Sequence, residues 1–495
     1  MTHKRGIAPL AVLIAWTLAA TPTMSAESPD TPTTTSVSLG TADHDQAARF
    51  RKTLAFDATE ATVNRAAADR TAYPDLTFGV PLSKAEAAEV LRRNQVALDI
   101  VPAIELASAN ASWAGVWIDH QSGGVPVFQF AGNAEGQALA LEKALPRGTD
   151  YRLASVGRSI SELERAKASV WDAADALRTR GIEITGVGID TPGNRLRIGV
   201  LAFDATTEAA LTDALGPDVE VHQQDYGTAD ACPETGCLPI KAGIGVTDAN
   251  DKFPCTVGYL AKRTDTTPDQ LVAITAGHCI KLGNKSSYWQ HGGVDVGQVS
   301  TKGTGVYVHG YYNNSTADVG AFRTNRLSAA NRRTRNLVLY STGGTTADVI
   351  GYAAQSSQVV GTVVCRTGRT TDVKCGNVQD TSIDEYSIVW KDSTCSAKLY
   401  NYLIKDSVEY SIDGLGGDSG APVYAISLPY PYDRYKATMY GTHFDSPCGS
   451  TWHSGWSGWY SAVDHGISRL QASFPGFAIT MCTTATCGLP DPIGD

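Results

Sequence analysis

The chain has 495 residues, of which 42% are hydrophobic and 19% charged, with a mean hydropathy of −0.15. This composition excludes an intrinsically disordered protein and supplies the cores of roughly three domains of about 150 residues each. The net charge of −10 argues against a nucleic-acid partner, and no apolar run reaches the ~18 residues of a membrane-spanning helix, so we expect no membrane partner.

The N-terminus has the pattern of a secretory signal. Polar and basic residues at positions 3–5 precede an apolar stretch over 7–20, and small residues follow it up to Ala26. We predict a signal peptide over residues 1–26, with cleavage after Ala20 as the alternative. The chain is then secreted into oxidising surroundings, where an even number of cysteines indicates disulfides.

A polar segment rich in Pro, Ser and Thr covers residues 27–45, and we predict a disordered linker there. Two helical stretches follow, over 46–71 and 83–97. The second begins with Ser83 and has Glu86 three residues later, which is the pattern of a capping box.

A weak internal duplication runs from 113 to 221, and each copy reads as a hairpin, a helix and a strand. A longer helix, Ser159–Arg180, separates the copies. The region 46–227 is therefore predicted to be α+β. We find no catalytic group in it, and we expect its lone His120, which lies near a turn, to be an ordinary surface residue.

The composition changes at about residue 230. All ten cysteines lie from Cys232 onward, and we take 228–495 as a second folded region. Short strand-like runs recur there between turn signals, which predicts an all-β barrel or sandwich. One helix is expected over Ser461–Leu470. The strand-like runs are Val257–Ala261, Leu271–Thr275, Gly305–Val308, Leu337–Tyr340, Thr362–Cys365, Ser387–Trp390, Ala421–Ala425 and Met439–Thr442.

Three short motifs in this second region carry chemistry. They are Thr-Ala-Gly-His-Cys over 275–279, Ala-Asp-Val-Gly over 317–320, and Gly-Gly-Asp-Ser-Gly-Ala-Pro over 416–422. We see no glycine-rich phosphate loop and no metal-binding spacing of Cys or His. We therefore expect neither a cofactor nor a metal.

The motifs contain the parts that an activated serine needs. A serine hydroxyl such as that of Ser419 is a poor nucleophile until a base takes its proton, and His278 can be that base. The imidazole needs a carboxylate, here Asp318, to hold its tautomer. The oxyanion needs backbone N–H donors, for which we expect the amides of Gly417 and Ser419.

These motifs, in the order His, Asp, Ser, resemble those of the chymotrypsin-like serine peptidases over roughly 243–470. The resemblance implies an all-β two-barrel domain, a secreted serine endopeptidase, and proteins or peptides as substrates. We expect a monomer.

A second resemblance concerns Val364–Thr371, which closes at Cys375 and looks like a loop of the bacterial α-lytic protease and streptogrisin type. That resemblance implies an ion pair between Arg366 and Asp418. It also implies that 46–227 is a pro-region, which assists folding and inhibits the product. The chain is then a zymogen, and the mature enzyme is expected to begin between residues 224 and 243.

The cysteines fit this resemblance, although spacing alone fixes no pairing. The expected disulfides are Cys232–Cys237, Cys255–Cys279, Cys365–Cys375, Cys395–Cys448 and Cys482–Cys487.

The sequence departs from the family pattern around the expected primary pocket. Gly414–Gly416 lacks the usual cysteine, Ala421 replaces a glycine, and Phe444 stands in the pocket-edge stretch that includes Thr442. By the resemblance Asp413 and Thr442 bind substrate. A carboxylate at Asp413 favours Lys or Arg before the cut, whereas a rebuilt pocket favours an apolar or aromatic residue.

Two other classes of function remain open. One is a secreted esterase, for which Asp445, His453 and His465 follow Ser419 in the sequence. The other is a catalytically inactive serine-peptidase-like binding module.

Overall fold

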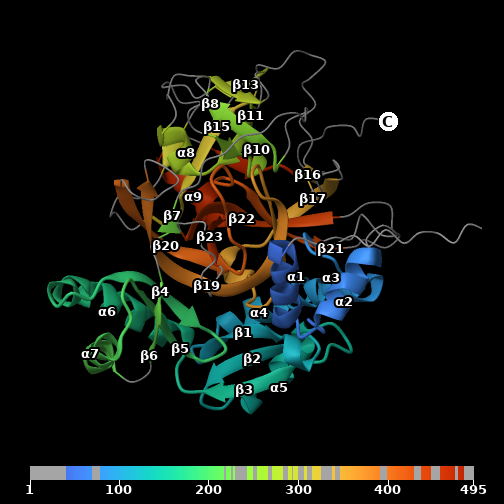
Figure 1. Ribbon diagram of the computed structural model, residues 1–495. Coiled ribbons are helices and arrows are strands. Elements are labelled where there is room, and N and C mark those ends of the chain that lie inside the picture. The colour runs from blue at the N-terminus through green and yellow to red at the C-terminus, as the bar shows by residue number, and fades with distance from the viewer. Residues whose placement is uncertain are drawn as a thin grey trace, which may run out of the picture. The chain divides into compact units, whose positions relative to one another are not determined.

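The computed structural model describes most of the chain from residue 41 onward (Figure 1). The expected signal peptide over 1–26 and the linker as far as residue 40 lie outside the described residues. The described ranges are 41–69, 78–216, 219–224, 227–228, 242–248, 254–265, 270–282, 288–291, 294–298, 306–308, 315–324, 337–339, 346–390, 398–427, 436–447, 457–473 and 478–483.

The first elements are helices, and they correct two predictions. Helix α1 (Thr41–Thr53) begins inside the segment that we predicted to be a disordered linker, so 41–45 is helical. The single helix predicted over 46–71 is divided, because Ala55 adopts a positive φ of 57° after α1, and α2 (Glu60–Asp69) begins anew. A left-handed residue cannot continue a right-handed helix.

Helix α3 (Lys84–Asp99) has the predicted capping box: the Ser83 hydroxyl accepts from the Glu86 amide, and the Glu86 carboxylate accepts from the Ser83 amide. Its apolar face packs in the same hydrophobic cluster as residues of β18 (Val363–Gly368) and β21 (Pro422–Ser427). The short α4 (Val101–Ser108) follows.

The internal duplication predicted over 113–221 is confirmed. Each copy is an antiparallel hairpin, a helix and a third strand parallel to the second, and α6 (Ile160–Thr179) separates the copies. The first copy comprises β1 (Trp113–Asp119), β2 (Val125–Ala131), α5 (Ala138–Ala144) and β3 (Arg152–Val156). The second comprises β4 (Ile184–Asp190), β5 (Arg195–Val200), α7 (Ala205–Leu215) and β6 (Val219–Gln223).

From residue 242 the described chain is mainly β, as predicted, and all eight strand-like runs overlap strands. One sheet of the described residues combines nine strands: β8 (Gly245–Asp248), β9 (Cys255–Thr256), β10 (Tyr259–Arg263), β11 (Gln270–Thr275), β12 (Tyr288–His291), β13 (Val294–Gln298), β14 (Val306–Val308), β15 (Val319–Arg323) and β24 (Ile479–Met481). Helix α8 (Gly277–Leu282) follows β11, and α9 (Val463–Ser473) begins two residues after the predicted start.

The second sheet of this C-terminal region contains β18 and β21 together with β16 (Leu337–Leu339), β17 (Thr346–Tyr352), β19 (Asp372–Trp390), β20 (Lys398–Tyr410), β22 (Lys436–Pro447) and β23 (Gly458–Ala462). Two of the buried clusters in this region are centred on Trp289 with Phe322 and on Tyr410 with Tyr440, and the first also contains residues of the second sheet, such as Phe444. This arrangement fits the predicted two-barrel fold.

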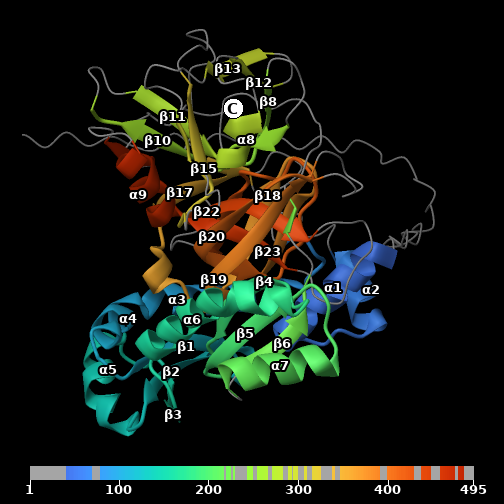
Figure 2. The same ribbon diagram turned by 90° about the vertical axis from the view of Figure 1, so that its left-hand side faces the viewer.

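Strands from the N-terminal region extend this second sheet. Strand β4 pairs antiparallel with β19, where Val187 faces Asp384 and Gly186 faces Glu385. The short β7 (Gly227–Thr228) pairs with both β19 and β22. Figure 2 shows β4–β6 beside β19, with α6 and α7 along them. The sheet of the second repeat is therefore continuous with the second sheet of the C-terminal region.

The structure also corrects the prediction for His120, which is buried rather than a surface residue, with an exposed fraction of 7%. Its Nε2 lies 2.6 Å from the carbonyl oxygen of Gly361, a residue of the C-terminal region. The turn position seen in the sequence could not indicate this contact, because the partner is 241 residues away.

Candidate active site

His278 and Asp318 form a tightly bonded pair. His278 lies in the first turn of α8, and its ring Nδ1 is 2.5 Å from Asp318 Oδ2. The backbone N–H of His278 donates to Asp318 Oδ1 at 2.9 Å. Asp318 is completely buried and His278 is 2% exposed. Since a carboxylate can only accept, Nδ1 carries the proton and Nε2 is the basic nitrogen.

Asp318 is itself held at the start of β15. Its amide donates to the hydroxyl of Ser461 at 2.9 Å, and Ser461 comes from β23 of the other sheet. The site therefore lies where the two sheets meet. Ser461 was missed by the sequence analysis, because nothing in its neighbourhood distinguishes it from other serines in strands.

Ser419 lies just before β21, and its backbone carbonyl accepts from the Thr256 amide at 2.8 Å. The next residue, Gly420, has a φ of +86°, and a Cβ there would lie 2.1 Å from Thr275 Oγ1 and 2.3 Å from the Thr256 carbonyl oxygen. Only glycine fits this close approach. The glycine of the motif thus fixes the turn that carries Ser419.

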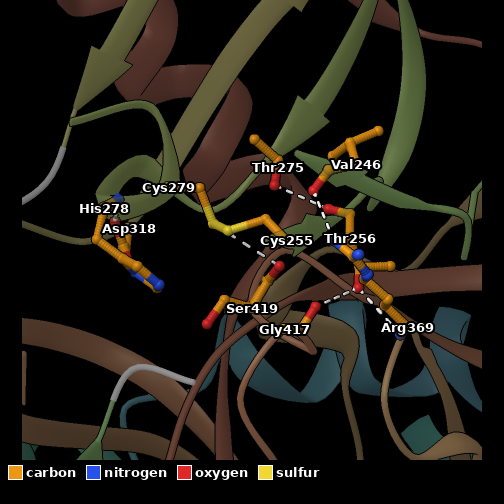
Figure 3. Close-up of a disulfide and its surroundings, with 10 residues drawn as sticks. All are labelled: Val246, Cys255, Thr256, Thr275, His278, Cys279, Asp318, Arg369, Gly417 and Ser419. Atoms are coloured by element: carbon orange, nitrogen blue, oxygen red, sulfur yellow. Dashed lines mark hydrogen bonds and ion pairs between the residues drawn. A yellow bond between two sulfur atoms is a disulfide. The ribbon is translucent and has the colours of Figure 1, made fainter. Parts of the chain in front are cut away.

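Figure 3 shows the His278 ring directed toward the side on which the Ser419 hydroxyl lies. His278 Nε2 is buried and has no hydrogen-bond partner among the residues that the structure describes. A buried ring nitrogen without a partner is unfavourable, and this nitrogen is available to accept a hydrogen bond.

The loop before Ser419 is tied to the first sheet. The carbonyl of Gly417 accepts from Thr256 Oγ1 at 2.6 Å, and Thr256 also contacts Ser419 through its amide. Thr370 Oγ1 donates to the carbonyl of Gly416 at 2.5 Å. These contacts hold the peptide groups on both sides of the expected oxyanion hole.

Arg366 and Asp418 form the expected ion pair, with Arg366 Nη2 3.0 Å from Asp418 Oδ2 and both side chains fully buried. Asp418 also accepts from the amides of Thr370 and Leu415, at 2.9 and 3.1 Å, and from the hydroxyl of Thr371 at 2.7 Å. The carboxylate beside Ser419 therefore has both a counter-charge and several N–H and O–H donors.

Two of the expected disulfides occur in the structure: Cys255–Cys279 beside His278, and Cys365–Cys375 across β18 and β19. Cys482 is also disulfide-bonded. The expected partner Cys487 and the pairs Cys232–Cys237 and Cys395–Cys448 lie outside the described residues.

The expected substrate-binding residues Asp413 and Thr442 contact different elements, since Asp413 is bonded to Arg366 and Thr442 pairs with β21. The Asp413 carbonyl accepts from Arg366 Nη2 at 2.7 Å, and burial raises the pKa of the Asp413 carboxyl while the charge of Arg366 lowers it. Thr442 faces Pro422 on β21. Phe444 is fully buried in the cluster around Trp289 and Phe322.

His443, which the sequence analysis missed, is fully buried between these groups. Its Nδ1 lies 3.0 Å from the Tyr410 hydroxyl, and its Nε2 lies 3.3 Å from Arg366 Nη1. Burial, followed by the charge of Arg366, lowers its pKa well below the usual value. His443 is therefore a neutral ring on β22, and its backbone is hydrogen-bonded to Gly420 and Ala421, which follow Ser419.

Among the described residues, no group of three or more His, Cys, Asp or Glu side chains could hold a metal ion. In the same part of the chain, no helix is long and apolar enough to cross a membrane.

Comparison with known proteins places part of the chain in a family. Residues 244–428 match the family model for trypsin. Among solved structures, a Nocardiopsis protease is 19% identical, with 49% of this chain and 99% of that chain covered and a TM-score of 0.32. Thermobifida fusca protease A is 19% identical (49% and 98% covered, TM-score 0.32), and Cellulomonas bogoriensis chymotrypsin is 20% identical (50% and 100%, TM-score 0.30). No curated protein is similar enough to match.

The trypsin match includes His278, Asp318 and Ser419 and covers strands of both sheets, but it ends before β22, β23 and β24. The match and the described fold give the same assignment. Residues 244–428 are therefore similar to the trypsin family, which indicates a chymotrypsin-like serine endopeptidase domain in this part of the chain.

Proposed function

We propose that the protein is a secreted, monomeric serine endopeptidase made as a zymogen, in which Ser419, His278 and Asp318 carry the reaction. The observation that supports this most strongly is the 2.5 Å contact between His278 Nδ1 and Asp318 Oδ2, with the opposite ring nitrogen unpartnered among the described residues and directed toward Ser419 (Figure 3).

In the proposed reaction, Ser419 Oγ attacks the carbonyl carbon of the peptide bond while His278 Nε2 takes the hydroxyl proton. Asp318 stabilises the imidazolium that results. The amides of Gly417 and Ser419 donate to the oxyanion. The C–N bond then breaks, and His278 gives its proton to the departing amine. Water attacks the acyl group on Ser419, with His278 again as base, and the acid product leaves.

We assign 46–227 to an inhibitory pro-region. Strand β7 supports this assignment, because Thr228 and Gly227 pair with Ser446 and Pro447 of β22, the strand that contains Thr442. An extended substrate also binds such a peptidase by adding a strand. Strand β7, which lies within the range 224–243 proposed for the start of the mature enzyme, is thus next to the strand where substrate is expected.

Active-site labelling of the purified chain with a fluorophosphonate tests the proposal. The reagent should modify Ser419 in the wild-type protein and fail to modify His278→Ala, because the base is then missing. A protein that no reagent modifies after removal of the pro-region would instead be the inactive binding module. A reactive serine that is insensitive to His278→Ala would indicate the esterase.

A further inference from the structure

One segment of the N-terminal region is docked on the peptidase part through backbone groups. The amide of Ile118 donates to the carbonyl of Val360 at 2.8 Å, and Trp117 forms a parallel bridge with the same residue. Gly361 has a φ of +91°, and a Cβ there would lie 2.8 Å from the Ile118 carbonyl oxygen. The two backbone segments therefore approach each other too closely for any residue other than glycine at position 361.

His120 ends this docked segment, and each of its ring nitrogens has a neighbour that fixes its protonation. Arg93 Nη1 lies 3.1 Å from Nδ1, and a guanidinium can only donate, so Nδ1 accepts. The Gly361 carbonyl oxygen lies 2.6 Å from Nε2 and can only accept, so Nε2 donates. This geometry requires the neutral ring, with its single proton on Nε2.

We propose that His120 is a pH-sensitive contact, at which a second proton on the ring releases the segment 117–120 from Gly361 and weakens the hold of the N-terminal region on the peptidase. The inference rests on the pro-region proposed above. A proton on Nδ1 would point at the N–H of Arg93, so the hydrogen bond is replaced by repulsion. That repulsion is removed only when the ring leaves this position.

The charged groups around His120 are Arg93 and Glu89 from α3, and Asp119, which Arg152 binds. Burial, opposed by the Gly361 carbonyl, and then the charge of Arg93 lower the pKa of His120 to about 4, although Asp119 and Glu89 act in the opposite direction. A free histidine has a pKa of about 6.5. The His120 ring thus binds a proton less well in the docked form than in the free form. The free energy that the neutral ring contributes to docking is therefore present above pH 6.5 and is lost as the pH falls from about 6.5 toward 4.

Two other groups, near the boundary between the N-terminal region and the second sheet, also have shifted pKa values. His222 has its pKa lowered to about 4 by burial and by Arg197, so it acts in the same direction as His120. Asp380, whose carboxyl lies against Gly188 of β4, has its pKa raised to about 6 by burial. Asp380 therefore favours docking in acid and opposes the histidines. A test of His120 must therefore cancel the pH-dependent effects of His222 and Asp380 on docking.

The test uses the full chain with Ser419→Ala, so that no cleavage intervenes, and measures hydrogen-exchange protection of the Ile118 amide at pH 7.5 and pH 5. The same measurement is made with His120→Gln added, because the introduced amide can accept from Arg93 and donate to Gly361 without titrating. At each pH, the protection factor of the Ile118 amide in the chain with His120 is divided by that in the His120→Gln chain. This ratio should be about 30-fold lower at pH 5 than at pH 7.5. A ratio that changes less than threefold overturns the proposal.

Asn94→Ala is the matched control, because Asn94 Oδ1 accepts from the Val363 amide across the same boundary and does not titrate. It should lower protection by the same factor at both pH values. If His120→Gln does not fold, NMR titration of the His120 ring in the Ser419→Ala chain decides: a midpoint near 4 upholds the proposal, and one near 6.5 overturns it. Neither result depends on peptidase activity, which labelling of Ser419 tests separately.

Discussion

Arg366 Nη2 lies 3.0 Å from Asp418 Oδ2, and neither side chain is exposed to solvent. This contact joins β18 to the residue immediately before Ser419. Because Asp418 also accepts from Leu415 in the same loop, the position of Ser419, the proposed nucleophile, depends on a charge located 52 residues before Asp418 in the chain.

The first prediction concerns this ion pair. Arg366→Met should destabilise the peptidase domain by about 3–5 kcal/mol, because it leaves the Asp418 carboxylate buried without its counter-charge. Urea denaturation measures the change. The control is Arg263→Met, which removes a more accessible ion pair with Asp265 and should cost about 1 kcal/mol or less. Equal effects of the two substitutions would contradict the role assigned to Arg366.

The second prediction separates Asp318 from the residue that holds it. Asp318→Asn should lower kcat about 10⁴-fold with the fold retained, since the amide favours the wrong tautomer of His278. Ser461→Ala removes one hydrogen bond to the Asp318 amide, worth about 1 kcal/mol, and should lower kcat no more than about tenfold. Steady-state kinetics with one peptide substrate measures both. A Ser461→Ala enzyme as impaired as Asp318→Asn would show that Ser461 does more than position the carboxylate.

The third prediction concerns the pro-region. Domains rich in non-local contacts fold slowly, and β4 supplies a ready strand for β19. Expression of 228–495 alone should therefore give little active enzyme, and 27–227 added in trans should restore it. The active secreted form should begin between residues 224 and 243, as N-terminal sequencing would show. Equal yields without the pro-region, or an active enzyme that begins near residue 27, would contradict the assignment.

The fourth prediction concerns primary specificity. Arg366 already provides a positive charge near Asp413, and burial disfavours the charged Asp413 carboxylate by raising its pKa, so a substrate cation gains little there. The enzyme should cleave after Phe or Leu faster than after Arg, and Asp413→Ser should change cleavage after Arg less than about tenfold. Peptide substrates that differ only in this residue provide the measurement. A strong preference for Arg that disappears in Asp413→Ser would show that Asp413 binds the substrate cation.

The sequence was sufficient for the local elements. The hairpin–helix–strand repeats, the Ser83 capping box and the strand-like runs each depend on neighbours close in the chain, and the structure has them. It was not sufficient where a partner is remote. His120 was expected to be exposed because its contact, Gly361, is 241 residues away, and the support of Asp318 by Ser461 spans 143 residues. The break at Ala55 was missed because alanine favours helices and rarely adopts a positive φ.

The most direct test of the central proposal is to label the processed, purified protein with a fluorophosphonate and identify the modified residue by peptide mass spectrometry. We predict a single modified serine, Ser419, with peptide hydrolysis lost in the same proportion as the residue is labelled. In Ser419→Ala, labelling and hydrolysis should both disappear, although the Cys255–Cys279 disulfide and the fold remain. Modification of another serine, or hydrolysis by Ser419→Ala within about tenfold of wild type, would contradict the proposed mechanism.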